Sequence, residues 1–348
     1  MNAKKMISVC LLLVGFGAFA QQTDMSLIPY RQGDKWGYAT PERKIVIQPK
    51  YNEANWFSEG YASVKIGNRY GYINKTGKLV IPAKFTVAKS FRKGYMPNAK
   101  KPEGDSVLFA GASMKASGDE ICINTRGAVM LKCPAISENS VLENRIPVET
   151  KVVQKTYSLQ NNNGLFDKIV DDYKISGSDE TYYIAVKNNQ YGVFNSKFDT
   201  IVPFQYNSIK VNRKSEVPFL EVNQGGMYGV VMADGKMAIA PEYTNMTTVD
   251  GGNGKEYVII RKGGKTYVKD ITNKDIISTG YNDIIYDDAG FIITTDNDMR
   301  GYYFTDNTMI QPKYKEVKAM NGNKYLMVKT AAGKVGYINT AGDEYFVE

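Results

Sequence analysis

The sequence contains no histidine, and this absence removes several kinds of active site. Ser-His-Asp and Cys-His nucleophile pairs, zinc sites with imidazole ligands and a near-neutral imidazole base all require that residue. An enzyme of this composition needs paired carboxylates, an activated lysine or a metal cluster instead. We therefore expect a protein without catalytic activity.

Long apolar runs are also scarce. The stretch from Met6 to Phe16 is too short to cross a bilayer, and nothing later reaches about 18 consecutive apolar residues, so no membrane span is expected. The stretch follows Lys4-Lys5 and precedes Ala18-Phe19-Ala20, which is the order of a secretory signal peptide. Residues 1–20 are therefore expected to be removed, and the mature protein to reach the periplasm, the outer surface or the medium.

Cysteine is scarce as well, with two residues beyond the signal segment, Cys122 and Cys133. They flank a hairpin in which Gly127 is expected to hold the turn. This register places Cys122 opposite Met130 and leaves Cys133 about three residues away from it. Two alternatives remain open: a possible disulfide, which would persist outside the cytoplasm, and the packing of two small apolar thiols.

What the sequence has in abundance is a repeat of about 35 residues. The segment 68–91 shows it in full, with an aromatic-Gly pair, a Gly six residues later, a β-branched run into Pro, and then an aromatic. A period of this length indicates a propeller or a solenoid, here of roughly nine units. The positions equivalent to Gly71 are Gly37, Ile121, Gly164, Gly192, Gly229, Thr266, Gly301 and Gly336.

The second glycine of each unit predicts a hairpin turn. A short hairpin loop needs one residue at positive φ, which Gly adopts freely and Asn tolerates. The segment from Asn74 to Gly77 is therefore expected to be a turn. Its equivalents at the last position are Gly127, Gly235, Asn307 and Gly342.

The proline of each unit predicts a strand end or an edge strand, because proline cannot donate to a β-ladder. With a closing strand such as Tyr61 to Lys65, one unit holds three or four short antiparallel strands and no helix. A meander this small cannot bury its own apolar face, so neighbouring units must stack. The aromatics expected in that shared core are Tyr51, Phe85, Tyr206, Tyr243 and Tyr314.

The segment Lys35-Trp36-Gly37-Tyr38, followed by Ile-Val-Ile-Gln-Pro-Lys-Tyr and by residues 57–62, resembles the bacterial WG-repeat (KWG-type β-repeat) family. The resemblance extends over about residues 27–348 and is weak between 98 and 180. Only Trp36 keeps the tryptophan of the motif. The resemblance implies a β-repeat architecture and no shared chemistry.

Repeat quality divides the chain into 21–97 with two good repeats, 98–180 with degenerate repeats, and 181–348 with later repeats that end in mid-unit. Loop insertions are expected at 98–118 and 137–155. Residues 27–31 match a closing strand and 336–347 an opening hairpin, so the two ends can complete one unit. A closed, propeller-like all-β array is preferred, and a twisted β-solenoid is the alternative.

Three motifs that suggest ligands have simpler explanations in the repeat. The segment 296–301 opens like a calcium loop, but Arg300 and Asn307 occupy ligand positions, so a hairpin turn is expected. The segment 263–266 resembles a phosphate loop without its first glycine or its helix. The pairs 171–172 and 287–288 are expected to be loop acids. No cofactor and no metal are therefore predicted.

Charge and aromatic content bear on partners. Removal of the signal lowers the formal net charge from +8 to +6, and the basic residues recur at hairpin tips, so a nucleic-acid partner is not expected. Aromatic side chains outside the repeat pattern are the candidates for exposed binding surfaces. They are Trp56, Tyr95, Tyr157 and Tyr303.

These observations favour an exported, non-catalytic β-repeat protein that binds or scaffolds an unidentified protein or glycan partner in the cell envelope. The alternatives are a carboxylate-dependent carbohydrate-active enzyme on a propeller and a purely structural envelope protein. Two buried carboxylates facing each other would favour the enzyme. An apolar or aromatic patch would favour partner binding.

Overall fold

The structure is a computed structural model that describes residues 23–96, 106–115, 118–134, 164–213, 215, 218–252, 254–287, 290–320 and 324–348. Every element of regular secondary structure within those residues is a β-strand, which confirms the predicted all-β class. The chain forms two compact units, Met1–Arg145 with Tyr345–Glu348, and Ile146–Glu344. The expected signal peptide lies outside the described residues.

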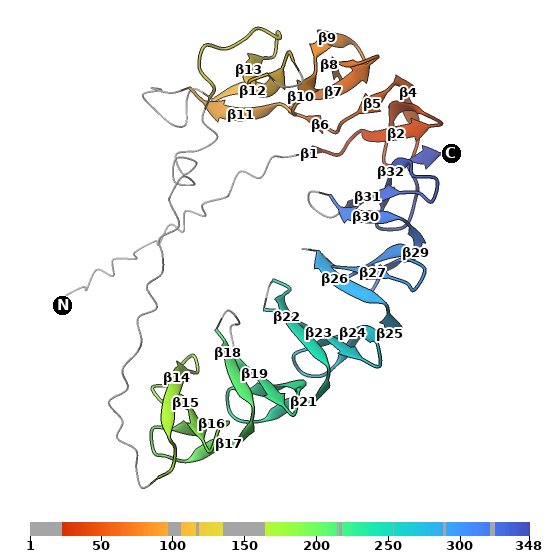
Figure 1. The fold of residues 1–348 in the computed structure, drawn as a ribbon. Coiled ribbons are helices and arrows are strands. Elements are labelled where there is room, and N and C mark those ends of the chain that lie inside the picture. Colours follow the sequence, from red (N-terminus) through yellow and green to blue (C-terminus); the bar gives the residue numbers. More distant parts are fainter. Residues whose placement is uncertain are drawn as a thin grey trace, which may run out of the picture. The chain divides into compact units, whose positions relative to one another are not determined.

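The first unit contains three small sheets (Figure 1). Their strand orders are β33-β2-β3-β4, then β1-β6-β7-β8-β9 with β5 also on β7, and β10-β12-β11 with β13 also on β12. The bounds are β1 Thr23–Asp24, β2 Ile28–Gln32, β3 Lys35–Ala39, β4 Ile45–Tyr51, β5 Glu53–Ala54, β6 Phe57–Ser58, β7 Tyr61–Ile66, β8 Arg69–Asn74, β9 Leu79–Phe85, β10 Val87–Ala88, β11 Arg92–Tyr95, β12 Ser106–Ser113, β13 Ile121–Asn124 and β33 Phe346–Val347.

The second unit contains five sheets, each an up-and-down meander in chain order. They are β14 to β17, β18 to β21, β22 to β25, β26 to β29 and β30 to β32 (Figure 1). The bounds are β14 Lys168–Lys174, β15 Thr181–Lys187, β16 Gln190–Asn195, β17 Thr200–Tyr206, β18 Ser208–Asn212, β19 Phe219–Gln224, β20 Met227–Met232, β21 Met237–Tyr243, β22 Asn245–Asp250, β23 Glu256–Lys262, β24 Lys265–Asp270, β25 Asp275–Tyr281, β26 Asp283–Asp287, β27 Gly290–Thr294, β28 Arg300–Phe304, β29 Met309–Tyr314, β30 Glu316–Ala319, β31 Tyr325–Lys329 and β32 Val335–Asn339.

The described residues form eight sheets, one fewer than the roughly nine predicted units. Gly164, predicted to anchor a unit of its own, lies in a turn before β14, which is the first strand of the Gly192 sheet. The anchor predicted at Thr266 is one residue off. Tyr267 pairs with Ile260 on the neighbouring strand as Gly229 pairs with Val222.

The predicted hairpin turns are confirmed. Gly77, Gly127, Gly235, Asn307 and Gly342 all have positive φ, between 71° and 91°. In each, the amide of this residue donates to the carbonyl oxygen three residues earlier, over 2.8 to 3.0 Å. Three further repeats carry no glycine at the equivalent position and use the same geometry, with positive φ at Arg43, Phe198 and Asn273.

The anchor glycine is required by the strand beside it. A Cβ on Gly71 would lie 2.6 Å from the carbonyl oxygen of Ile81 and 2.8 Å from the amide nitrogen of Ala83. The backbone comes this close because β9 bulges at Pro82, where the register shifts between Tyr70 and Tyr72 on β8. Proline therefore lies on an edge strand, as predicted, but inside it at a bulge rather than at its end.

The apolar cores lie between successive sheets. One cluster joins Phe219 and Ile239 of the β18–β21 sheet to Val258 and Ile260 of the next. Another joins Val268 of that sheet to residues of the β26–β29 sheet. The five aromatics that follow the prolines are at most 6% exposed. Successive sheets thus bury each other's apolar faces, as the repeat predicts.

The last strand completes the first sheet. β33 runs parallel to β2, with the Arg31 amide donating to the Tyr345 carbonyl and the Gly33 amide to that of Val347, both over 3.0 Å. The two ends of the chain therefore share a sheet, as their mid-repeat positions predicted. The detail differs, because the opening hairpin stays with β31 and only the residues after Glu344 join β2.

One predicted insertion contains a core strand. β12 lies inside the segment 98–118 and pairs with β10, β11 and β13. Its run Phe109-Ala-Gly-Ala lacks the tyrosine start and β-branched residues of the other closing strands, so the pattern did not reveal it. The predicted insertion at 137–155 lies outside the described residues.

Replacing Gly77 with valine is expected to cost about 1 to 3 kcal/mol, because its φ of 80° is unfavourable for a β-branched residue. The added Cβ would also lie 3.2 Å from the Ile47 side chain. Urea unfolding should show this loss, whereas the matched variant Lys78→Ala should change the midpoint little. Equal effects of the two substitutions would contradict the turn assignment.

Candidate functional site

The second unit has a groove between β22 and β26, the first strands of two successive sheets. Its volume is about 370 Å³. Its floor contains the buried side chain of Ile284, and Ile260 lines it with its backbone, because its side chain packs into the core on the other face of the sheet. This volume is at the lower end of the range of about 300 to 1,000 Å³ typical of small-molecule sites.

A second hollow of about 470 Å³ lies against the hairpin turns at 232–238 and 272–273. Its polar groups are partly used by those turns. The Asp234 carboxylate accepts the Lys236 amide, and the Asn273 amide donates to the Asp270 carbonyl. The β22–β26 groove is therefore the better candidate.

The preceding sheet boundary, between β18 and β22, is closed by polar contacts. The Thr248 hydroxyl donates to Glu221 Oε1 over 2.6 Å, and Asn212 Nδ2 donates to the Thr248 hydroxyl over 3.3 Å. Lys210 Nζ lies 3.5 Å from Glu221 Oε2. The two hydrogen bonds of Thr248 cross the boundary, and the Lys210–Glu221 ion pair lies within the β18–β21 sheet.

At the β22–β26 boundary the same three repeat positions are apolar. Ile259 occupies the position that Glu221 has in the preceding sheet, because each of them pairs with a valine on the third strand of its own sheet. Tyr286 replaces the threonine, and Val249 replaces the asparagine. All three line the groove and pack partly buried against the core below. The change from a hydrogen-bonded set to an apolar one gives this boundary its apolar wall.

Polar side chains gather among the remaining lining residues. Asn245, Thr247 and Thr266 line the groove, and none of their side chains hydrogen-bonds or ion-pairs with another described residue. Asn245 and Thr247 are exposed to solvent, and Thr266 is 5% exposed. The Asp283 side chain alternates with that of Ile284 and lies on the opposite face of β26. The groove therefore offers hydrogen-bonding groups that the surrounding protein does not use.

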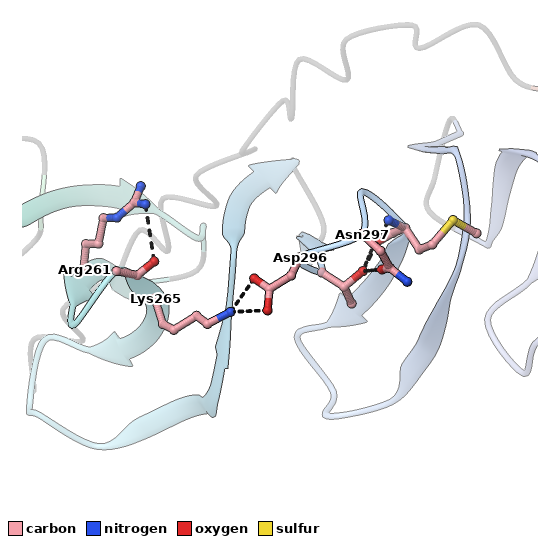
Figure 2. A network of polar contacts seen from close by, with 7 residues as sticks. Arg261, Lys265, Asp296 and Asn297 are labelled. Atoms are coloured by element: carbon pink, nitrogen blue, oxygen red, sulfur yellow. Dashed lines mark hydrogen bonds and ion pairs between the residues drawn. The ribbon is translucent and has the colours of Figure 1, made fainter.

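The two cations near the groove, unlike its polar side chains, have partners within the protein. Arg261 lines it and donates from Nη2 to the Gly264 carbonyl over 3.3 Å. Lys265, next in the hairpin, forms an ion pair with Asp296 of the following sheet, with Nζ 2.6 Å from Oδ2 (Figure 2). This ion pair links the two sheets, and the Asp296 carboxylate neutralises the charge of Lys265. Arg261 is the cation among the residues that line the groove.

The motifs explained by the repeat are hairpins in the structure. Gly263 and Gly264 form a two-residue loop with φ of 59° and 78° between β23 and β24. The calcium-like segment is a turn in which the Asp298 amide donates to the Thr295 carbonyl over 3.1 Å. The described residues contain no group of three or more His, Cys, Asp and Glu arranged to hold a metal ion.

The prediction that Asp171 and Asp172 are loop residues is wrong. Both lie within β14, beside a register shift. Such a bulge lets polar side chains interrupt a strand without breaking it. Arg213 Nη2 pairs with Asp171 Oδ1 over 2.7 Å. Asp287 ends β26, and its carboxylate accepts the Ala319 amide over 3.1 Å, whereas residue 288 is not described.

One acid in the described part of the chain is buried, Glu256 at the start of β23. Burial raises the pKa of its carboxyl, the negative charge of Asp250 raises it further, and a hydrogen bond with Ser215 opposes the change. The described residues therefore do not present two buried carboxylates that face each other.

Replacing Glu256 with glutamine is expected to raise the melting temperature at pH 7. A raised native pKa means that protonation favours the folded state, so this contribution is present at low pH and is lost as pH rises through the native pKa. The gain should vanish near pH 4. Thermal melts at both pH values test this, with the exposed Glu316→Gln as control. A gain that is the same at pH 4 and pH 7 would contradict the assignment.

Of the four aromatics predicted to be exposed, the three that the structure describes are buried or half-buried. Trp56 is 9% exposed, because the short strands on either side of it both pair with β7 and hold it against the sheet. Tyr95 and Tyr303 are half-buried, and the Tyr303 hydroxyl donates to Asn307 over 3.1 Å. Tyr157 lies outside the described residues. The predicted exposure of Trp56 is wrong.

Cys122 and Cys133 are joined by a disulfide, with their Cα atoms 5.3 Å apart. The expected register is present, since the Met130 amide donates to the Cys122 carbonyl over 2.8 Å. The chain then bends at residues 131–132 and brings Cys133 back toward its partner. The bend, which the register could not reveal, makes the bond possible.

Replacing both cysteines with alanine is expected to lower the stability of the first unit by about 2 to 3 kcal/mol, because the bond closes a short loop. Reduction of the natural protein should produce a shift of similar size, followed by tryptophan fluorescence during urea unfolding. The alanine variant should not respond to reductant. A wild-type midpoint that is insensitive to reduction would oppose this expectation.

Comparison with known proteins identifies the repeat. Residues 36–70, 70–97 and 191–228 match the family model described as WG containing repeat. The chain therefore carries WG repeats in both of its units. No curated protein matches it. The described residues include no helix with the length and apolar character of a membrane span.

Among solved structures, one of Kluyveromyces lactis Hsv2p is 8% identical, covers 85% of this chain and 96% of its own, and has a TM-score of 0.26. A protein of unknown function from Bacteroides caccae is 12% identical, with coverage of 91% and 90% and a TM-score of 0.23. These values describe distant likenesses, so the functional argument depends on the groove.

Proposed function

We propose that this WG-repeat protein is an exported, non-catalytic binding module that holds its partner in the β22–β26 groove. The observation that carries the proposal is the lining of that groove. It combines an apolar wall with polar side chains that have no partner among the described residues. A site of this composition fits a ligand that has both apolar and hydrogen-bonding surface.

The proposal of binding without catalysis rests on composition and burial. The chain lacks histidine, and Glu256 is the one buried acid in its described part. Asp283 is the one acid among the lining residues, and its exposed side chain lies on the face of β26 opposite to Ile284. An exposed carboxylate without a second nearby does not supply the acid and base pair that glycoside cleavage needs. Export to the envelope is proposed from the signal-like residues 1–20.

A purely structural role is less well supported. The boundary between β18 and β22 shows how a repeat closes when it serves packing, with Thr248 bonded to Glu221. The next boundary leaves Asn245 and Thr247 without such bonds. Side chains that do not support the sheets are free to contact a partner.

The test is capture from the native envelope by mature protein on a resin. Thr247→Trp should block the groove and abolish capture, because Thr247 is exposed and lines it. Thr200→Trp, at an exposed threonine that begins β17, is the matched control and should capture normally. The partner should be eluted chemically unchanged. Equal capture by both variants, or cleavage of the partner, would overturn the proposal.

One observation favours a second function, the scaffolding of a protein partner. In the first unit Val129 is 63% exposed and Leu131 is fully exposed, both on the segment closed by the disulfide. Exposed apolar side chains on a constrained loop suit a protein contact. If this function is the correct one, Leu131→Asn will abolish capture and Thr247→Trp will not.

A further inference from the structure

We infer that the first unit binds the surface of an anionic membrane through its outer hairpin turns. The turn surface, as we call it, consists of the segments 40–51, 74–85 and 124–132, each a turn with the residues that follow it. The inference goes beyond the proposed function, because the groove belongs to the second unit. Its support comes from the position of the turns, their charge and the apolar side chains that they expose.

The three turns are neighbours in the fold. The turn that ends at Gly77 lies against the preceding sheet, where the Tyr51 hydroxyl donates to the Gly77 carbonyl over 3.4 Å. The turn that ends at Gly127 lies against β9 in the same way, with Lys84 Nζ donating to the Gly127 carbonyl over 3.2 Å. β4 and β9 are the last strands of their sheets. The turns and these edge strands therefore form one outer surface of the first unit.

The turn surface is strongly basic. It contains eight Lys and Arg residues and one acid, Glu42. The equivalent positions of the second unit contain four lysines and eight acids. The segments compared are 195–206, 232–243, 270–281, 304–314 and 339–344. The positive charge is therefore particular to the first unit, and the turn geometry itself does not require it.

Most of these cations are available to a partner. Six of the eight are exposed and form no ion pair with another described residue, namely Lys44, Lys50, Lys78, Lys84, Arg126 and Lys132. In the second unit, by contrast, Lys313 pairs with Glu344 over 2.8 Å. The first unit has Leu79 and Val129 at the position of Glu344, since each of the three pairs with an isoleucine on the strand before it. Anionic lipid headgroups supply the negative charge that this surface lacks.

Apolar side chains are exposed among the cations. Leu79 is 42% exposed, Val129 is 63% exposed and Leu131 is fully exposed. Arg126 and Lys132 flank the last two in the sequence. The disulfide that closes this segment limits the freedom it has to lose on binding. Basic side chains around exposed aliphatic ones are the composition that binds at the headgroup boundary of a membrane. A soluble polyanion would contact the cations and leave Leu131 in water, so the composition favours a membrane.

The experiment measures flotation of the mature protein with protein-free vesicles. Vesicles of phosphatidylcholine mixed with phosphatidylglycerol should bind it, and vesicles of phosphatidylcholine alone should not. Lys78→Gln should weaken binding about fivefold, the usual effect of one basic residue near an anionic leaflet. Leu131→Asn should weaken it about tenfold or more, because the leucine leaves water at the headgroup boundary. Neither variant should lower the melting temperature, because both side chains are exposed.

The second unit supplies matched controls at equivalent positions. Lys236→Gln matches Lys78→Gln, because each lysine is exposed and follows the glycine of its turn. Met237→Asn matches Leu79→Asn, because the two side chains are 43% and 42% exposed and each begins the strand after its turn. Both controls should bind the anionic vesicles as the wild type does, whereas Leu79→Asn should bind them more weakly. A variant and its control that lose affinity equally would overturn the inference.

The remaining outcomes also decide the question. Equal binding to both kinds of vesicle, or to neither, would overturn the inference. Binding of heparin that is as tight and is unchanged in Leu131→Asn would show that the surface takes a soluble polyanion instead. If capture from the envelope depends on Leu131 but pure lipid does not bind, the partner is a protein and the inference is wrong. Thr247→Trp should leave vesicle binding unchanged, so the groove proposal and this inference fail independently.

Discussion

Replacing Tyr345 with alanine is expected to destabilise the first unit by about 3 to 5 kcal/mol, the usual cost of removing a large buried aromatic side chain. Tyr345 is 0% exposed, and its hydroxyl donates to the Pro41 carbonyl over 2.6 Å. Its own carbonyl accepts the Arg31 amide. A residue three positions before the last one thus holds β33 against β2.

Tryptophan fluorescence during urea unfolding measures this effect directly. The chain has two tryptophans, Trp36 and Trp56, and both belong to the first unit. Tyr345→Phe should lose about 1 kcal/mol, because only the hydroxyl bond is removed. Val347→Ala, at a position 52% exposed on the same strand, should change the midpoint little. An unchanged midpoint in Tyr345→Ala would show that β33 does not support the sheet.

Replacing Gly71 with alanine is expected to cost about 3 kcal/mol or more, because the added methyl group would overlap backbone rather than a movable side chain. The nearest atoms belong to Ile81 and Ala83 on the bulged edge strand. Relief would require the bulge at Pro82 to move. The φ of Gly71 is not positive, so backbone strain adds nothing to this cost.

Gly67→Ala is the control for this second prediction. Gly67 has a φ of 58° and open space around it, so its alanine variant pays for strain alone, about 1 to 2 kcal/mol. The difference between the two variants, measured by urea unfolding of the first unit, isolates the close approach of the two strands. If Gly67→Ala costs as much as Gly71→Ala, the explanation of the anchor glycine is wrong.

The hairpin turns and the shared cores could be predicted because they depend on local chemistry and spacing. A glycine or asparagine at a turn position, such as Gly77 or Asn307, predicts positive φ in any surroundings. An aromatic residue such as Phe85 follows each repeat proline within three residues. β12 and Trp56 could not be predicted, because neither carries a repeat signal. Their places come from the strands that pair on either side of them.

The candidate groove could be predicted even less. Ile259 and Tyr286 have the features of ordinary repeat positions in the sequence, and the pattern places Thr266 one position away from its register in the structure. Only the register shows that they replace the hydrogen-bonded glutamate and threonine of the neighbouring boundary. That comparison needs strands from different sheets, which the sequence does not align.

The sequence by itself determined the all-β class, the roughly 35-residue unit, the turn residues and the need for neighbouring units to pack together. These follow from φ preferences and from apolar spacing, which act over a few residues. The tertiary structure alone decided why the anchor must be glycine, that the last strand joins the first sheet, and which boundary opens into a groove. These depend on contacts between residues far apart in the chain, and such contacts exist only after the sheets have stacked.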